Sequence, residues 1–127
     1  MMIFTIAVLG AHQDTQANLH AFKFAESLIG LGHSINRIFF YHEGVSVALE
    51  SIDLPADEFN YSKAWAEFSA KNEIELAVCI ANGSRRGIVE DKNSDKMNSL
   101  AKGFELVGLG QLIDAISSSD RYVEFTL

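Results

Sequence analysis

Short apolar runs alternate along the chain with longer amphipathic segments. Ile3–Leu9 and Glu75–Ile80 are nearly continuous apolar runs, and Ile35–Tyr41 is rich in β-branched and aromatic residues. Such runs are typical of strands that are buried on both faces. We therefore predict that these three segments are the central strands of a sheet. Two further strands are predicted over Phe104–Val107 and Tyr122–Thr126.

The segments between these strands carry apolar residues at helical spacing. Helices are predicted over Tyr61–Ala70 and Leu109–Ser117, with a short one over Val45–Leu49, whereas Ala81–Gly87 is interpreted as a loop. A further helix follows the first strand and ends near Gly30, and its apolar positions are Leu19, Phe22, Ala25, Leu28 and Ile29. The side chains predicted to face inward from the last helix are Leu109, Leu112, Ile113 and Ile116.

Alternation of strands and helices indicates a parallel sheet with right-handed crossovers. We predict a single-domain α/β protein over residues 1–127, a three-layer α/β/α structure with a mainly parallel sheet of about five strands. The 48% hydrophobic composition is consistent with one sizeable core.

A formal net charge of −7 argues against binding of nucleic acid over a broad surface, which needs clustered cations. A local basic patch stays possible, because five cations fall in one stretch: Arg85, Arg86, Lys92, Lys96 and Lys102.

The first nine residues, Met1–Leu9, are apolar but have neither a basic start nor a cleavage site, and they are too short to span a bilayer. We interpret them as the first strand of a cytoplasmic protein that does not associate with a membrane. The single cysteine, Cys79, excludes an internal disulfide.

Cys79 is the strongest candidate for chemistry. It lies near the end of the predicted strand Glu75–Ile80, and the carboxyl ends of parallel strands form the edge where open α/β sheets bind ligands. Arg85 and Arg86 follow closely, and nearby cations favour the reactive thiolate. The alternative interpretation is a small buried hydrophobic residue, a common role of a lone cysteine.

Histidines and carboxylates follow the first two predicted strands. His12 and Asp14 come after the first strand, and His42 and Glu43 come after the second, so all four are expected at the edge that carries Cys79. A Cys–His nucleophilic pair is one interpretation, and histidines in surface loops are the other. The spacing does not match a zinc site, and we expect no metal.

The chain resembles the DsrE/DsrF-like sulfurtransferase family over nearly its whole length. The FFY-x-EGV pattern and the cysteine followed by RRG are the most specific matches. The matching segments are Gln16–Val45, Ala64–Phe68, Leu76–Val89 and Lys102–Phe125.

This resemblance implies that Cys79 is the catalytic residue, which accepts sulfane sulfur as a persulfide and passes it to another protein. It implies a sulfurtransferase without a bound cofactor, which works beside upstream and downstream sulfur carriers. Two branches of the family fit: one serves 2-thiolation of the tRNA wobble uridine and the other serves sulfur oxidation. In both, paralogous subunits form a heterohexamer. A third possibility is a non-catalytic interaction subunit with a buried structural Cys79.

Overall fold

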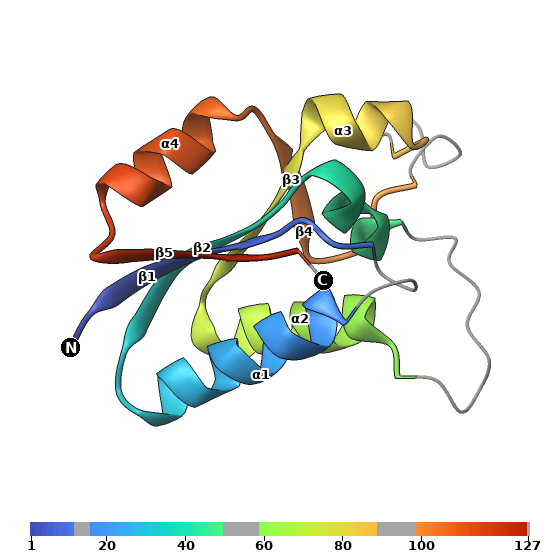
Figure 1. Ribbon diagram of the computed structural model, residues 1–127. Coiled ribbons are helices and arrows are strands. Elements are labelled where there is room, and N and C mark those ends of the chain that lie inside the picture. The colour runs from blue at the N-terminus through green and yellow to red at the C-terminus, as the bar shows by residue number, and fades with distance from the viewer. Residues whose placement is uncertain (12–15, 50–58, 89–98, 127) are drawn as a thin grey trace.

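A computed structural model describes residues 1–11, 16–49, 59–88 and 99–126. Five strands form one sheet in the order β4-β3-β2-β1-β5, and every neighbouring pair is parallel (Figure 1). The strands are β1 (Ile3–Val8), β2 (Ser34–Phe40), β3 (Glu75–Cys79), β4 (Phe104–Val107) and β5 (Arg121–Phe125).

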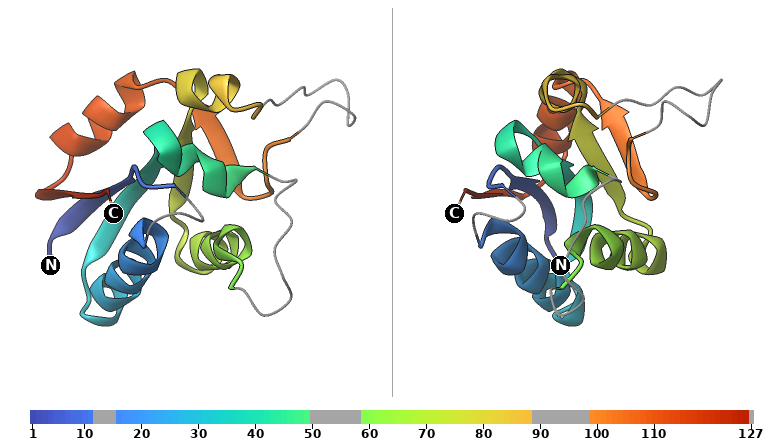
Figure 2. Two further views of the ribbon diagram at one scale, coloured as in Figure 1. Left: turned by 45° about the vertical axis from the view of Figure 1, so that its right-hand side comes forward. Right: turned by 90° about the vertical axis from the view of Figure 1, so that its right-hand side faces the viewer.

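Helices cover both sides of this sheet. Figures 1 and 2 show helices on either side of it, which makes three layers. The helices α1 (Ala17–Gly30) and α2 (Tyr61–Asn72) lie below the sheet in Figure 1, and α3 (Ile80–Arg85) and α4 (Gly110–Ser117) lie above it. A 3-10 helix, η1 (His42–Ala48), follows β2. None of the helices in the described ranges is long and apolar enough to cross a membrane.

The predicted fold class is confirmed, and β1, β2 and β3 are the central strands of the sheet. Their apolar runs are buried because helices pack on both faces. On the lower face Phe40 contacts the ring of Trp65 from α2, with 5.7 Å between ring centroids, and both side chains are fully buried.

The prediction of a loop over Ala81–Gly87 is wrong, because α3 begins directly after β3. Asn82 and Gly83 have low helix propensity, and tertiary contacts override it. A Cβ on Gly83 would lie at an ordinary van der Waals distance, 3.5 Å, from the Cβ of Ile88, so α3 packs directly against the segment that follows it.

The inward face predicted for the last helix is also partly wrong. Leu112 is buried and Ile116 is half-buried, but Leu109 and Ile113 are 49% and 65% exposed. The small residue Ala115 is buried instead, and its carbonyl accepts a hydrogen bond from Thr5 Oγ1 of β1 at 3.1 Å. This short contact places α4 close to the sheet at Ala115. The apolar side chains of Leu109 and Ile113 then point away from the sheet and stay exposed.

Gly44 fixes the path of η1 across the end of β1. A Cβ at this position would lie 1.9 Å from the backbone oxygen of Val8. Only glycine permits this approach, and it presses η1 against the carboxyl end of the central strand. The start of η1 is therefore held beside the strand ends at which candidate functional residues were predicted.

Candidate functional site

Cys79 is the last residue of β3, at the carboxyl edge of the sheet, and its register partner is Val107 of β4. Its position at a strand end agrees with the sequence-based expectation. The residue does not lie on a loop, however, because α3 starts at the next position. It is also only 1% exposed, so the sulfur is covered in this conformation.

The strand register shows which face of the sheet carries Cys79. Side chains alternate along a strand, so Cys79 shares the face of Ala77. This is the upper face in Figure 1, because it also carries Thr5, which bonds to α4. The side chains that continue this face from strand to strand are Ala77, Phe39, Ala7 and Glu124.

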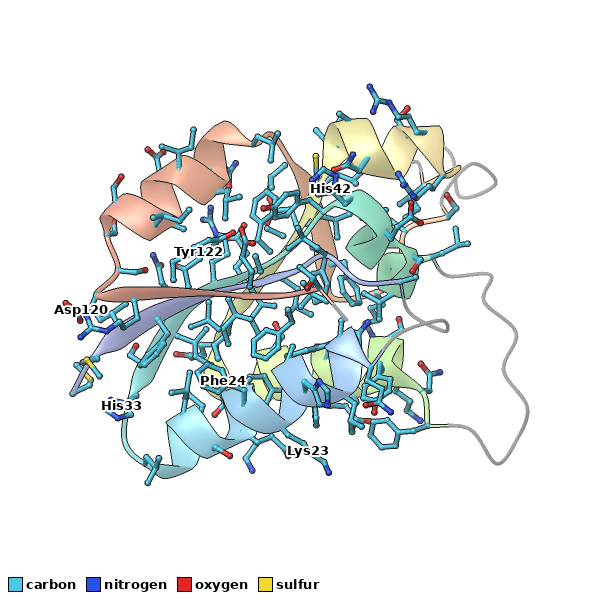
Figure 3. All side chains as sticks on the ribbon, viewed as in Figure 1. Lys23, Phe24, His33, His42, Asp120 and Tyr122 are labelled. Atoms are coloured by element: carbon cyan, nitrogen blue, oxygen red, sulfur yellow. The ribbon has the colours of Figure 1, made fainter. Side chains whose placement is uncertain are left out.

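Two phenols and a carboxylate form a polar cluster on the same face. Glu124 Oε1 accepts hydrogen bonds from the Tyr122 hydroxyl at 2.6 Å and from the Tyr41 hydroxyl at 3.2 Å. Tyr122 lies on the side of the sheet that faces α4 (Figure 3). Burial, together with the hydrogen bond to Glu124, raises the pKa of Tyr122 well above its usual range, and burial likewise raises the pKa of Tyr41. Both phenols are therefore held neutral.

Contacts between η1 and α3 connect the ends of β2 and β3. The backbone N–H of His42 donates to Asn82 Oδ1 at 2.8 Å, and Arg86 Nη1 donates to the Asn82 carbonyl oxygen at 3.2 Å. Arg86 Nη2 also pairs with the Glu43 carboxylate. That hydrogen bond and the charge of Arg86 hold the pKa of Glu43 below its usual range. These four residues are called the α3–η1 clasp below.

His42 has a backbone conformation that is uncommon for a residue with a side chain. Its φ is 53°, in the left-handed region, and its ring lies 4.8 Å from that of Tyr41. Figure 3 shows the side chain beside the beginning of α3. Non-glycine residues stay in this region only where the surroundings hold them there, and the hydrogen bond that the His42 N–H donates to Asn82 Oδ1 does so.

The structure brings together some of the predicted site residues and separates others. His42 and Glu43 lie at the same edge as Cys79, as predicted, whereas His12 and Asp14 lie outside the described residues. Arg86 contacts Glu43, and Arg85 is exposed at the end of α3.

The basic stretch does not form one patch in the described part of the chain. Lys102 precedes β4, whereas Arg85 and Arg86 come after the end of the neighbouring strand β3, so they lie toward opposite edges of the sheet. Lys92 and Lys96 fall in the segment that the structure does not describe.

Sequence reasoning missed Asn82. Its place in an Asn-Gly pair suggested a turn. The available signal is that Asn82 lies three residues after Cys79. In any helix that starts at the strand end, a residue at this position belongs to the first turn.

The cavities described by the structure lie elsewhere. One of about 550 Å³ is lined mainly by residues of α2 and of the turn before β4, and Cys79 is not among its lining residues. In the described ranges no group of three or more His, Cys, Asp or Glu side chains is placed to hold a metal ion.

Comparison with known proteins identifies relatives over the whole chain. The family model described as "DsrE/DsrF-like family" matches residues 2–125. A protein of Aliivibrio fischeri named "Sulfurtransferase TusD homolog" is 40% identical over 129 residues, which cover 98% of each chain. The "Sulfurtransferase TusD" of Proteus mirabilis is 37% identical over 128 residues, again 98% of each chain.

Solved structures show the same fold. The ychN protein of E. coli has a TM-score of 0.80 at 20% identity, over 98% of this chain and all of that one. The protein MTH1491 of Methanobacterium thermoautotrophicum, described as of unknown function, has a TM-score of 0.69 at 17% identity, over 98% and 99% of the two chains.

Proposed function

Because the chain belongs to the DsrE/DsrF-like family, we propose that it is a sulfurtransferase that carries sulfane sulfur as a persulfide on Cys79. The observation that carries the proposal is the position of the only thiol in the chain, at the carboxyl end of a central parallel strand. This is the edge at which open α/β sheets place reactive groups.

The reaction is an exchange between sulfur atoms. The Cys79 thiolate attacks the outer sulfur of a persulfide on the donor, and a new S–S bond forms while that of the donor breaks. The donor leaves as a thiolate, which takes up a proton. An acceptor thiolate then attacks the outer sulfur on Cys79 and releases the Cys79 thiolate. Each step exchanges one S–S bond for another, so it needs no external oxidant or reductant.

Arg85 and Arg86 are proposed as supporting residues that supply positive charge near Cys79, from the end of the helix that follows it. A cation near the sulfur favours the thiolate and the persulfide anion over their protonated forms. The charge of Arg86 is shared with Glu43, so we expect Arg85 to contribute the larger part.

The branch of the family that we favour is the TusD-like one, in which the relay serves 2-thiolation of the tRNA wobble uridine, because both relatives reported above are TusD sulfurtransferases. A DsrE-like subunit of a sulfur-oxidation relay is the alternative. A thiol that works by exchange must stay reduced, which favours the cytoplasm.

The proposed partners are upstream and downstream sulfur carriers and paralogous subunits of the TusB and TusC type, or of the DsrF and DsrH type, within a heterohexamer. Exposed apolar side chains near the sheet edge support such an assembly. Ile80 is 49% exposed beside Cys79, and Leu109 and Ile113 are exposed on and before α4.

Mass spectrometry of the intact protein tests the central proposal. After incubation with a persulfide donor, we expect the wild type to gain the mass of one sulfur atom, and we expect a reductant to remove it. Cys79→Ser, a nearly isosteric change, should fold normally but gain no sulfur. A serine variant that still supports transfer in a reconstituted relay would refute the role of Cys79.

Burial of Cys79 favours one rival, a non-catalytic interaction subunit whose cysteine is structural. This rival predicts that a small alkylating reagent modifies Cys79 only when the whole protein unfolds. The sulfur carrier predicts modification in native conditions, at a rate that does not follow the free energy of global unfolding.

A further inference from the structure

A sulfur carrier whose reactive sulfur is buried needs a change of conformation that exposes the sulfur. Another protein must bring its own sulfur atom into bonding distance of Cys79, yet Cys79 is only 1% exposed. The strand that carries it is paired on both sides, by β2 and by β4, so β3 itself is firmly held. The element that can move is α3, which begins at the very next residue and has only six residues.

Two kinds of contact hold α3 in place. On one side Gly83 packs against Ile88 and Leu106, and the Ile88 N–H donates to the Gly83 carbonyl at 2.8 Å. On the other side the α3–η1 clasp joins Asn82 and Arg86 to the segment after β2. The first contact combines apolar packing with a backbone hydrogen bond between residues close in sequence, so we treat it as the fixed point about which α3 turns.

The contacts within the clasp are the ones that hydrogen bonds to water can replace. The side chains of Glu43 and Arg86 are 62% and 30% exposed, and an ion pair with this exposure contributes little because water competes for both groups. Asn82 Oδ1 accepts its hydrogen bond from the backbone N–H of His42, a residue that is held in the left-handed backbone region. Loss of this hydrogen bond releases His42 as well as α3.

We infer that Glu43, Asn82 and Arg86 are positioning residues that set how often Cys79 is accessible. When the clasp is closed, α3 rests against η1 and covers the sulfur. When the clasp opens, α3 turns about Gly83 and the sulfur becomes reachable. The inference rests on the proposed sulfur-carrying role of Cys79, and it adds the regulation of that site.

The rate of alkylation of the folded protein by iodoacetamide measures this opening. Asn82→Leu removes the hydrogen bond to His42 without changing charge, and Glu43→Gln removes the ion pair. Loss of one ordinary hydrogen bond shifts an opening equilibrium roughly fivefold, so Asn82→Leu should be alkylated about five times faster than the wild type. Glu43→Gln should also be alkylated faster, but by a smaller factor, because the ion pair it removes is exposed.

Electrostatic effects on the sulfur are separated from opening by the pH dependence. A change in local charge moves the pH at which the alkylation rate rises, and it changes the limiting rate at alkaline pH only by the smaller amount with which thiolate nucleophilicity follows the pKa. More frequent opening raises that limiting rate. The exchanged pair Glu43→Arg with Arg86→Glu restores the ion pair with reversed polarity, so we expect its limiting rate to return toward that of the wild type.

The matched control is another ion pair among the described residues, at the other end of β3. Arg37 Nη2 lies 2.7 Å from Glu75 Oε2, and Glu75→Gln is the same substitution far from the clasp. This variant should leave the limiting alkylation rate unchanged. Urea unfolding of every variant provides the global stability with which the rates are compared.

Two results would overturn the inference: limiting rates that stay at the wild-type value in both clasp variants, or rates that rise equally in Glu75→Gln and follow global stability. The test is independent of sulfur transfer. Failure of the wild type to take up sulfur would refute the proposed function, whereas the alkylation rates report on the clasp in either case.

Discussion

The hydroxyls of Tyr41 and Tyr122 converge on one acceptor, the Glu124 carboxylate. Ionisation of either phenol would place a second negative charge beside Glu124 in a partly buried position. Burial raises the pKa of each phenol, the charge of Glu124 raises it further, and burial also raises the pKa of Tyr61. All three tyrosines of the chain are thus held in the neutral form.

The cluster predicts how stability depends on alkaline pH. A phenol whose pKa is raised by folding contributes stability that is complete below its unfolded pKa of about 10 and is lost as the pH rises above that value. We expect the free energy of unfolding, measured with urea, to fall as the pH is raised past this point. Tyr122→Phe should flatten the fall. Tyrosinate absorbance that rises at the same pH in folded and urea-unfolded protein would contradict the prediction.

At the scale of elements, a buried hydrogen bond joins the two helices below the sheet. Trp65 Nε1 of α2 donates to Asn18 Oδ1 of α1 at 2.8 Å, and both residues are at most 1% exposed. The Asn18 amide nitrogen has no hydrogen-bond partner among the described residues. The pair therefore fixes the position of one helix against the other without being fully satisfied itself.

Asn18→Ala should destabilise the protein by about 1–3 kcal/mol, the usual cost of leaving a buried donor such as Trp65 Nε1 unpaired. Fluorescence of the single tryptophan during urea unfolding measures the change. Asn72→Ala is the control, because the half-buried Asn72 bonds only to a carbonyl within its own helix. It should cost less than about 1 kcal/mol, as is usual for such a bond. Equal losses in the two variants would show that the contact between the helices is unimportant.

The sequence predicts the strands better than the helices of this fold. The strands are buried apolar runs, and any arrangement that buries them needs helices on both faces. The helix α3 depends on contacts that the local sequence does not contain, above all the bond between Asn82 and His42. The position of Cys79 at a strand end could be predicted for the same reason as the strand. Its burial depends on tertiary contacts that the local sequence does not contain, so it could not be predicted.

At the scale of the molecule, the apolar side chains that are left exposed are the best indication of assembly. Ile113 is 65% exposed on α4, above the sheet, and Leu31 is 76% exposed just after α1, below it. Only the first lies on the side of the sheet that carries Cys79. We therefore expect partner subunits to cover the α4 side.

Ile113→Glu should weaken the complex with co-expressed paralogous subunits and leave the stability of the isolated chain nearly unchanged, because the side chain is exposed. Leu31→Glu, the same kind of change on the other side, should leave the complex intact. Size-exclusion chromatography and native mass spectrometry measure both. A wild type that stays monomeric at micromolar concentration beside these partners would contradict the assembly.

The pairing of β1 with β5 has a consequence for protein synthesis. Asp120 and Leu9 donate backbone hydrogen bonds to Ile3 and Phe125 across this pair, at 2.7 and 2.8 Å, although the partners are more than a hundred positions apart. On the ribosome, β1 emerges before every other strand, and its neighbour β5 emerges last. Until residues 121–125 are made, one edge of β1 stays unpaired and open to neighbouring nascent chains. Premature termination before β5 would thus yield an aggregation-prone product even though the segment with Cys79 is complete.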